Sequence, residues 1–372
     1  MAQSIFPMAV CNRYTRRQLG ADLIAIGALC ALLAGCAVSR PMPIAPVSHG
    51  LQLPAGYSSS VIAAGLRQPT AMTLGPVPDP LTGGPRRLYV AQLNGGEDDA
   101  TGQIVAIDES TGAQDVVLTQ LRKPTGLAWF NDMLVVVSFR DVLAYSIRDR
   151  KLQSSKTFVS GVRFNGRSLG HIRVGPSVDP FTRETEPRLY FHSSGGDSAV
   201  SGYLYSMRLD GSDERIVARG LKNAYATGWD PAGTLYVTEI GDNIASVPVE
   251  EVNIIQQDGD YGWPNCAAGA ACSGTLAPLA TFPPHATPTG IVWWEGDLIV
   301  TLWGPTDPHV ARVNLSTGTV SDFARGLQHP IDVIVSKQGT LLLLDYAGSI
   351  VEVRKPATTP NIAPPQPSPT PN

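Results

Sequence analysis

The sequence predicts an all-β protein made of six similar units, and three observations support this prediction. Glycine and proline supply 37 and 31 of the 372 residues, so turns are unusually frequent. No apolar stripe with helical spacing continues for three turns or more between residues 51 and 355. One order of a turn and three or four short strands recurs six times over this range, at roughly 50 residues per unit. This combination is typical of a β-propeller, and we expect six four-stranded blades.

Each unit opens with a turn, called here its lead-in turn, which precedes an apolar strand and then a second strand rich in Leu, Tyr and Val. The six lead-in turns are Gly65–Pro69, Leu121–Pro124, Gly166–Leu169, Gly220–Asn223, His285–Pro288 and Gly326–Pro330. The second strands contain Leu88–Val90, Leu134–Val136, Leu189–Phe191, Leu235–Val237, Leu298–Val300 and Leu341–Leu343. These strands are apolar on both faces, as expected when each blade packs between two neighbours.

The last unit ends at its third strand, so its sheet needs a strand from elsewhere. A short strand at residues 57–63 precedes the first lead-in turn and has no other partner in the pattern. We therefore expect this N-terminal strand to complete the sixth blade and close the ring, which removes the open sheet edges.

Residues 1–36 have the features of an export signal. Arg13, Arg16 and Arg17 precede the apolar run Leu23–Leu33, which is too short to span a bilayer. The run ends in Leu-Ala-Gly-Cys at Cys36, which resembles the lipobox of bacterial lipoproteins. That resemblance implies cleavage before Cys36, lipid on its sulfur, and a location in the bacterial cell envelope, on the periplasmic side or the cell surface.

Two alternatives for this segment stay open. It could be an ordinary signal peptide in which Cys36 is incidental. Residues 15–19, Thr-Arg-Arg-Gln-Leu, also match a twin-arginine signal in part.

The segments that flank the propeller differ from it in composition. Residues 37–50 are rich in proline and small residues and are expected to be a tether, and residues 356–372 are expected to be a disordered proline-rich tail. Loss of residues 1–36 removes three arginines and one aspartate and takes the formal charge from −4 to about −6. This charge argues against nucleic acid as a partner. We expect a monomer that binds a sugar or another small molecule.

Two cysteines remain after the signal and the lipidated Cys36 are set aside. Cys266 and Cys272 lie close together in the sequence, and an exported protein meets an oxidising compartment. We therefore expect a local disulfide, since two ligands alone make a poor metal site.

Several motifs resemble those of the soluble quinoprotein glucose and sorbosone dehydrogenases. They are Leu53–Tyr57, Gly220–Asn223, Thr238–Asn243, Glu251–Ile255 and Asp260–Pro264. The resemblance covers residues 51–355 and is strongest in the fourth unit. It implies a six-bladed propeller that binds pyrroloquinoline quinone (PQQ) and calcium and oxidises a sugar by hydride transfer to the quinone. A histidine would act as base, and basic side chains would hold the carboxylates of PQQ.

The resemblance assigns roles to residues near the fourth lead-in turn. Lys222 and Asn223 stand where the family binds PQQ, with lysine in place of the family's arginine. Gly241 and Asp242 stand where the family holds calcium. Asp197 matches the acidic loop that positions the base.

The base itself departs from the family pattern. Arg167 stands at the position expected for histidine, and the nearest imidazole is His171, which is displaced by ~13 Å along a strand. We assign His171 as the catalytic base, with Arg167 and Asp197 as further catalytic residues. Alternatively, His171 is a hydrogen-bonded histidine near the channel. Arg167 could then bind a cofactor carboxylate or pair with Asp197.

Three functions fit these observations. The first is a PQQ-dependent sugar dehydrogenase. The second is a propeller without cofactor that binds a glycan or an envelope protein, which the missing histidine favours. The third is lactone hydrolysis at a calcium ion, for which Glu239, Asp242 and Asp345 are few ligands. His285 and His329 also lie on lead-in turns, but their spacing does not suggest a transition-metal site.

Overall fold

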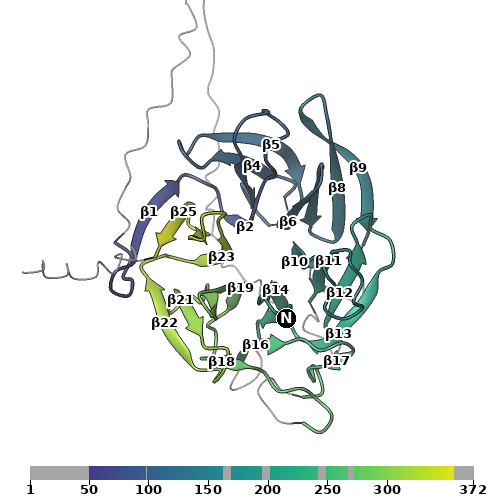
Figure 1. Ribbon diagram of the computed structural model, residues 1–372, viewed down its shortest axis with the longest axis vertical. Helices are drawn as coiled ribbons and strands as arrows, with labels where there is room; N and C mark the ends of the chain where they lie inside the picture. The colour runs from purple at the N-terminus through teal and green to yellow at the C-terminus, as the bar shows by residue number, and fades with distance from the viewer. Residues whose placement is uncertain are drawn as a thin grey trace, which may run out of the picture. The chain divides into compact units, whose positions relative to one another are not determined.

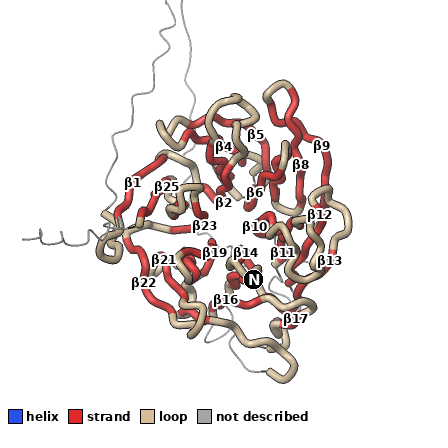
Figure 2. Tube along the Cα trace, in the orientation of Figure 1, coloured by secondary structure: helices blue, strands red, loops and turns tan. Residues whose placement is uncertain are grey.

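The computed structural model describes residues 50–97, 99–161, 169–194, 202–241, 249–266 and 272–355. These residues belong to one compact unit, Pro43–Asn372. The predicted signal, nearly all of the predicted tether and the predicted tail lie outside the described residues. Within the described ranges every regular element is a β-strand (Figure 2), and no helix there is long and apolar enough to cross a membrane.

The strands form six small sheets arranged in a ring (Figure 1). Blade 1 contains β2 (Pro69–Leu74), β3 (Arg87–Gln92), β4 (Gly102–Asp108) and β5 (Gln114–Leu121). Blade 2 contains β6 (Pro124–Phe130), β7 (Met133–Ser138), β8 (Asp141–Arg148) and β9 (Lys151–Val159). Blade 3 contains β10 (Leu169–Val174), β11 (Arg188–Ser193), β12 (Gly202–Arg208), β13 (Arg215–Leu221) and the two-residue β17 (Gly259–Asp260).

The other three blades complete the ring. Blade 4 contains β14 (Ala224–Trp229), β15 (Leu235–Glu239), β16 (Glu250–Ile254) and β18 (Ala280–Phe282). Blade 5 contains β19 (Pro288–Trp294), β20 (Asp297–Leu302), β21 (His309–Val313) and β22 (Val320–Arg325). Blade 6 contains β23 (Pro330–Val335), β24 (Leu341–Asp345), β25 (Ser349–Arg354) and β1 (Ser58–Ala63). The predicted six-bladed propeller is therefore confirmed.

The ring closes as the sequence predicts. Strand β1 pairs antiparallel with β25, from Ser58 opposite Arg354 to Ala63 opposite Ile350. The sixth sheet therefore joins the N-terminal and C-terminal strands of the propeller, and its core strand β24 is fully buried.

One pairing was not expected from the sequence. Strand β17, which contains the start of the Asp260–Pro264 motif, pairs in parallel with the outer strand of blade 3. The Trp263 amide also donates to the carbonyl of Gly220, at 2.8 Å. Gly220 has a φ of 77°, and a Cβ atom there would lie 2.5 Å from the Gly262 nitrogen. Only glycine allows this approach, so the motif ties blade 3 to the lead-in turn of blade 4.

Tyrosines on the second strands link the blades to one another. In three blades the tyrosine hydroxyl donates to the carboxylate of an Asp-Pro turn in the same blade. This bond fixes the position of the tyrosine side chain. The pairs are Tyr89 with Asp79 at 2.6 Å, Tyr190 with Asp179 at 2.5 Å, and Tyr236 with Asp230 at 3.1 Å. Tryptophans of the next blade pack against two of these rings: Trp129 lies 5.1 Å from Tyr89, and Trp229 lies 5.3 Å from Tyr190.

We predict that Tyr190→Phe destabilises the propeller. Asp179 is 2% exposed, so loss of the hydroxyl removes a donor from a buried carboxylate and should cost about 1–3 kcal/mol. Chemical denaturation would measure this loss. Tyr145→Phe is the matched control, because burial alone raises the pKa of that phenol. Equal losses in both variants would contradict a specific role for the Tyr190 bond.

Candidate functional site at the upper mouth

The inner strands of all six blades line a central channel (Figure 1), and they all begin at the same end of it. We call this end the upper mouth and the end where the inner strands finish the lower mouth. The lead-in turns and the loops after the second strands both lie at the upper mouth. Since these connections vary without disturbing the sheets, the upper mouth can present functional side chains.

Backbone hydrogen bonds join these two sets of loops in five blades. In each, the residue after the second strand donates its amide to a lead-in carbonyl. The pairs are Leu93 to Gln68, Phe139 to Lys123, Ile240 to Asn223, Trp303 to Thr287 and Tyr346 to His329, at 2.9–3.1 Å. The upper rim is therefore fixed to the sheets by main-chain contacts.

A side chain at the end of the second strand strengthens this link in four blades. Its oxygen accepts the amide of a residue in the lead-in turn. The pairs are Arg67 to Gln92 at 2.8 Å, Arg122 to Ser138 at 3.2 Å, Lys222 to Glu239 at 2.5 Å, and Gln328 to Asp345 at 2.8 Å. Glu239 and Asp345, which the sequence offered as possible calcium ligands, thus hold turns in place.

The predicted cofactor residues Lys222, Asn223 and Gly241 lie together in blade 4. Lys222 is 6% exposed, and its ammonium lies 5.2 Å from the ring centroid of Trp263. The Asn223 carbonyl accepts the Ile240 amide, and the Gly241 amide donates to Glu250 at 3.2 Å. The structure therefore brings these three predicted residues to one part of the rim.

Below them lie three buried carboxyl groups, those of Glu239, Glu250 and Glu251. Asn253 donates its side-chain amide to Glu239 at 2.8 Å and to Glu251 at 3.3 Å. Burial and the nearby Glu251 raise the pKa of Glu239 well above its usual range, and burial raises the pKa of Glu250 to about 7. Among the described residues no three acidic, histidine or cysteine side chains are placed to hold a metal ion. The side-chain amide of Asn253 links two of these carboxyl groups within blade 4.

His171 lies in the channel and not on the rim. It is 1% exposed, and its Nε2 donates to the Thr70 carbonyl of blade 1 at 3.2 Å. Burial lowers the pKa of the imidazole to about 4, and its ring lies 5.0 Å from that of Tyr225. This placement does not suit a base that must touch a sugar hydroxyl, so the expectation that His171 is catalytic is corrected to the alternative of a hydrogen-bonded channel histidine.

Arg173, two residues further along the same strand, bridges the channel. Its guanidinium donates to Asp332 of blade 6 at 2.7 Å and to the Met72 carbonyl of blade 1 at 3.0 Å. Asp332 is fully buried and also accepts the Met72 amide, at 2.8 Å. The ion pair braces three blades against one another across the channel.

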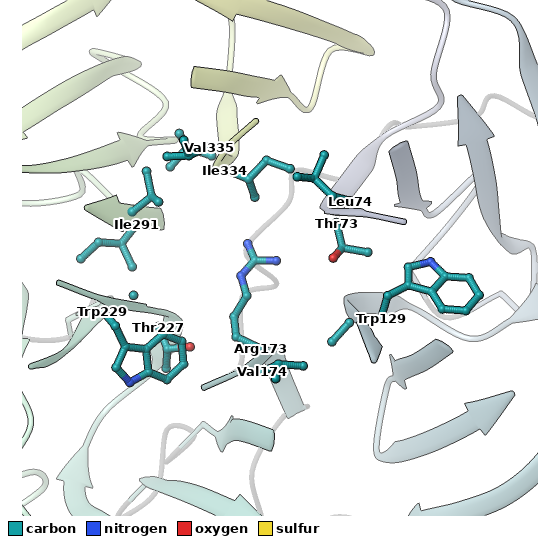
Figure 3. Close-up of a pocket in the computed structure, with 14 residues that line it drawn as sticks. Thr73, Leu74, Trp129, Arg173, Val174, Thr227, Trp229, Ile291, Ile334 and Val335 are labelled. Carbon is teal, nitrogen blue, oxygen red and sulfur yellow. The ribbon is translucent and has the colours of Figure 1, made fainter. Parts of the chain in front are cut away.

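The brace separates the upper mouth from a pocket at the lower mouth. This pocket of about 340 Å³ is lined by the ends of the inner strands, including Thr73, Thr227, Ile291 and Ile334. Figure 3 shows the Arg173 guanidinium near its centre. Its remaining lining is mostly aliphatic, and the predicted cofactor residues are not part of it.

His329 has surroundings that suit a proton acceptor better than those of His171. Its Nδ1 lies 3.2 Å from the Trp303 carbonyl, and its ring stacks on that indole with centroids 4.6 Å apart. A carbonyl can only accept, so Nδ1 carries the proton and Nε2 keeps its lone pair when the imidazole is neutral. The His329 amide donates to Asp345 at 2.9 Å, which fixes the backbone. Its place in a lead-in turn was visible in the sequence, but the tautomer was not.

The remaining predicted site residues have separate outcomes. A disulfide joins Cys266 and Cys272, the pairing expected from the sequence. Arg167, Asp197, Asp242 and Cys36 lie outside the described residues. Sequence analysis missed Arg173 and Asp332, although a charged residue in an otherwise apolar inner strand was a signal that could have identified them.

We predict that Glu250→Gln changes the pH dependence of stability. The pKa is about 7 in the folded protein and near 4.5 when unfolded, so the unfolded chain loses its proton first as pH rises. Stability contributed by protonated Glu250 is thus present at low pH and lost between pH 4.5 and 7, by roughly 3 kcal/mol.

Urea denaturation at several pH values would measure this difference. The variant should gain stability relative to the native protein as pH rises through this window. Glu186→Gln is the exposed control and should show no such trend. A constant difference between the native protein and Glu250→Gln across pH 4.5–8 would refute the prediction.

We further predict that Asp332→Asn destabilises the protein by about 3–5 kcal/mol, because it leaves Arg173 without its counter-charge inside the channel. Asp322→Asn is the control, since that carboxylate forms an exposed pair with Arg325 and should contribute at most about 1 kcal/mol. Thermal and chemical unfolding would compare them. Similar small losses in both variants would show that the channel pair is not a brace.

The part of the chain that builds this site resembles a known protein family. A family model described as Glucose / Sorbosone dehydrogenase matches residues 206–306. No relative is found among curated protein sequences. The matched residues include Lys222, Asn223, Gly241 and the buried carboxyl group of blade 4.

Solved structures with the same fold include sugar dehydrogenases. The PQQ-bound aldose sugar dehydrogenase of Streptomyces coelicolor is 20% identical, with a TM-score of 0.63 over 81% of this chain and 99% of that chain. A putative glucose dehydrogenase of Thermus thermophilus is 17% identical, with a TM-score of 0.64 over 80% and 100%. A calcium structure of a Trichoderma reesei carbohydrate-active enzyme of family AA12 is 14% identical, with a TM-score of 0.64 over 85% and 99%.

At these identities the structural similarities show the fold. They extend over the whole propeller, whereas the family model covers the outer strand of blade 3, all of blade 4 and the first two strands of blade 5. The resemblance to the glucose and sorbosone dehydrogenases is therefore confirmed, by sequence for residues 206–306 and by fold for the whole propeller.

Proposed function

We propose that this protein is a PQQ-dependent sugar dehydrogenase of the glucose and sorbosone type, with its site at the upper mouth. The observation that supports this most is the position of the family-model match. It includes the part of the rim where Lys222, Asn223 and Gly241 come together, and not only the strands of the scaffold.

The side chains at the upper mouth fit an anionic cofactor. Basic residues lie on the lead-in turns of three described blades: Arg67, Arg122, Lys123 and Lys222. PQQ has three carboxylates, and charge-assisted hydrogen bonds from such residues would hold them. When bound, PQQ would supply a hydride acceptor, and a calcium ion held nearby would make it a stronger one. We keep the Gly241 carbonyl and Asp242 as the proposed calcium ligands.

We assign His329 as the group that accepts the proton of the sugar hydroxyl. Its Nδ1 contact leaves Nε2 available, and stacking on Trp303 fixes the plane of the ring. His171 instead braces the channel beneath the site. Arg167 and Asp197 stay as proposed catalytic residues, with Arg167 also a candidate ligand for a cofactor carboxylate.

The proposal includes a place in the cell. Lipid on Cys36 would anchor the propeller in the bacterial envelope, and residues 37–50 would act as its tether. We propose that the protein acts there as a monomer on sugars that reach the envelope. Globomycin treatment or mass spectrometry of the N-terminus would test the lipid directly.

We predict that PQQ and calcium together raise the melting temperature of the protein, because a ligand that binds only the folded state stabilises it by mass action. Reduction of a dye in the presence of aldoses would then measure activity. Lys222→Met should weaken cofactor binding by about tenfold through loss of one charge-assisted bond. Lys337→Met is the control, since this exposed lysine lies at the lower mouth.

Two outcomes would count against the enzyme. The absence of any melting shift at saturating cofactor would favour the propeller without cofactor that binds a glycan or a protein. A shift without dye reduction would show binding of the cofactor with no sugar oxidation. His329→Gln separates these effects, because it should abolish dye reduction and keep the melting shift.

A further inference from the structure

We propose that the pocket at the lower mouth binds a medium-chain aliphatic carboxylate. The carboxylate of this ligand would accept hydrogen bonds from Arg173 at the centre of the pocket, and its hydrocarbon chain would lie against the aliphatic ends of the inner strands. The inference does not depend on PQQ or on sugar oxidation, because the ion pair of Arg173 and Asp332 lies between this pocket and the upper mouth.

The charges around the pocket favour an anion. Of the described residues that line it, Arg173 alone carries a charge. Its partner Asp332 is not part of the lining and has a fully buried carboxylate, whereas 15% of the Arg173 side chain remains exposed. The ion pair therefore turns its positive end toward the pocket. An anion in the pocket would lie nearer to the guanidinium than to the carboxylate, so attraction would exceed repulsion.

Arg173 also has hydrogen-bond donors left for a ligand. A guanidinium carries five N–H groups. Within the described part of the chain, one of them donates to the Met72 carbonyl at 3.0 Å and one to Asp332 at 2.7 Å. A ligand without an acceptor would cover the other N–H groups and leave them unpaired, which is costly away from water. A carboxylate supplies two acceptor oxygens that match the fork of a guanidinium.

Two threonine hydroxyls flank the guanidinium. Thr73 on inner strand β2 and Thr227 on inner strand β14 both line the pocket. In Figure 3 the hydroxyl oxygen of each lies on the side that faces Arg173. Neither hydroxyl makes a hydrogen bond to another described residue, so both can donate to a ligand oxygen. Donors from three inner strands thus face the same part of the pocket.

The rest of the wall is apolar and determines what the carboxylate must carry. Its aliphatic side chains include Leu74, Val174, Ile291, Ile334 and Val335, and all of these except Ile291 remain partly exposed. A hydrocarbon chain would remove this surface from water, which should tighten binding by about three- to fourfold for each methylene. The volume of about 340 Å³ is at the small end for ligand pockets and suits a ligand of roughly six to eight carbons.

Calorimetric titration of the protein with hexanoate, 1-hexanol and hexylamine tests the charge of the ligand. We expect hexanoate to bind at least about tenfold more tightly than hexanol, because hexanol offers Arg173 a single neutral acceptor. Protonated hexylamine should bind most weakly, since the guanidinium repels it. Equal affinities for the three compounds, or no binding of hexanoate, would overturn the proposal.

A series of carboxylates tests the apolar wall. Between acetate and hexanoate, each added methylene should tighten binding by about three- to fourfold. An affinity that does not change with chain length would indicate a site for bare anions and would contradict the proposed ligand. So would binding of a peptide that ends in leucine without binding of hexanoate, because the pocket would then serve a protein C-terminus.

Single variants locate the binding. Thr227→Val preserves the shape of the side chain and should weaken hexanoate binding by about fivefold through loss of one donor. Thr157→Val is the matched control and should have no effect, because this exposed threonine lies on outer strand β9. Lys222→Met should also leave hexanoate binding unchanged. Loss of binding in Lys222→Met would place the carboxylate at the upper mouth and overturn the proposal.

A double variant tests Arg173 itself. Arg173→Gln combined with Asp332→Asn removes both charges and leaves neither of them unpaired in the channel. It should bind hexanoate and hexanol alike, with circular dichroism as the check on its fold. A folded double variant that still prefers hexanoate would refute the role of Arg173. If the double variant does not fold, equal hexanoate affinities of Thr227→Val and Thr157→Val are enough to overturn the site.

Discussion

In four blades, a hydrogen bond between a side chain at the end of the second strand and the lead-in turn beside it determines how the upper mouth is built. Chemically different acceptors perform this task in different blades: an amide at Gln92, a hydroxyl at Ser138 and carboxylates at Glu239 and Asp345. In each case the donor is the backbone amide of the turn residue. The side chain of that residue can therefore vary without loss of the bond. The channel can therefore change its chemistry without a change in the scaffold.

The ion pair of Arg173 and Asp332 sets a second limit on function. It crosses the channel and, with His171, places charged and polar groups between the two mouths. A small molecule that enters from above meets this barrier, so the proposed reaction would take place at the upper mouth. The barrier also explains why His171, which the sequence suggested as a base, lies where a substrate would not reach it.

Much of the fold could be predicted because its signals are local. Lead-in turns, apolar strands and the closing strand each depend on a few adjacent residues, and β1 and β25 pair as expected. The contacts that were missed join distant parts of the chain: Arg173 and Asp332 are 159 residues apart, and β17 joins blade 3 from a loop beyond blade 4's third strand. For the site, residue types placed Lys222, Asn223 and Gly241 correctly on one rim. Burial and tautomer, on which the proposal of His329 in place of His171 rests, exist only in three dimensions.

The motif that relates this chain to the sugar dehydrogenases is largely structural in its contacts. Glu239 holds the Lys222 turn, Asn253 links Glu239 to Glu251, and the segment around Trp263 ties blade 3 to blade 4. A match to such a motif therefore reports a shared scaffold more strongly than a shared substrate. The chemistry must be decided by the side chains that the scaffold leaves exposed. These include Arg67 and His329, which lie outside the matched residues 206–306.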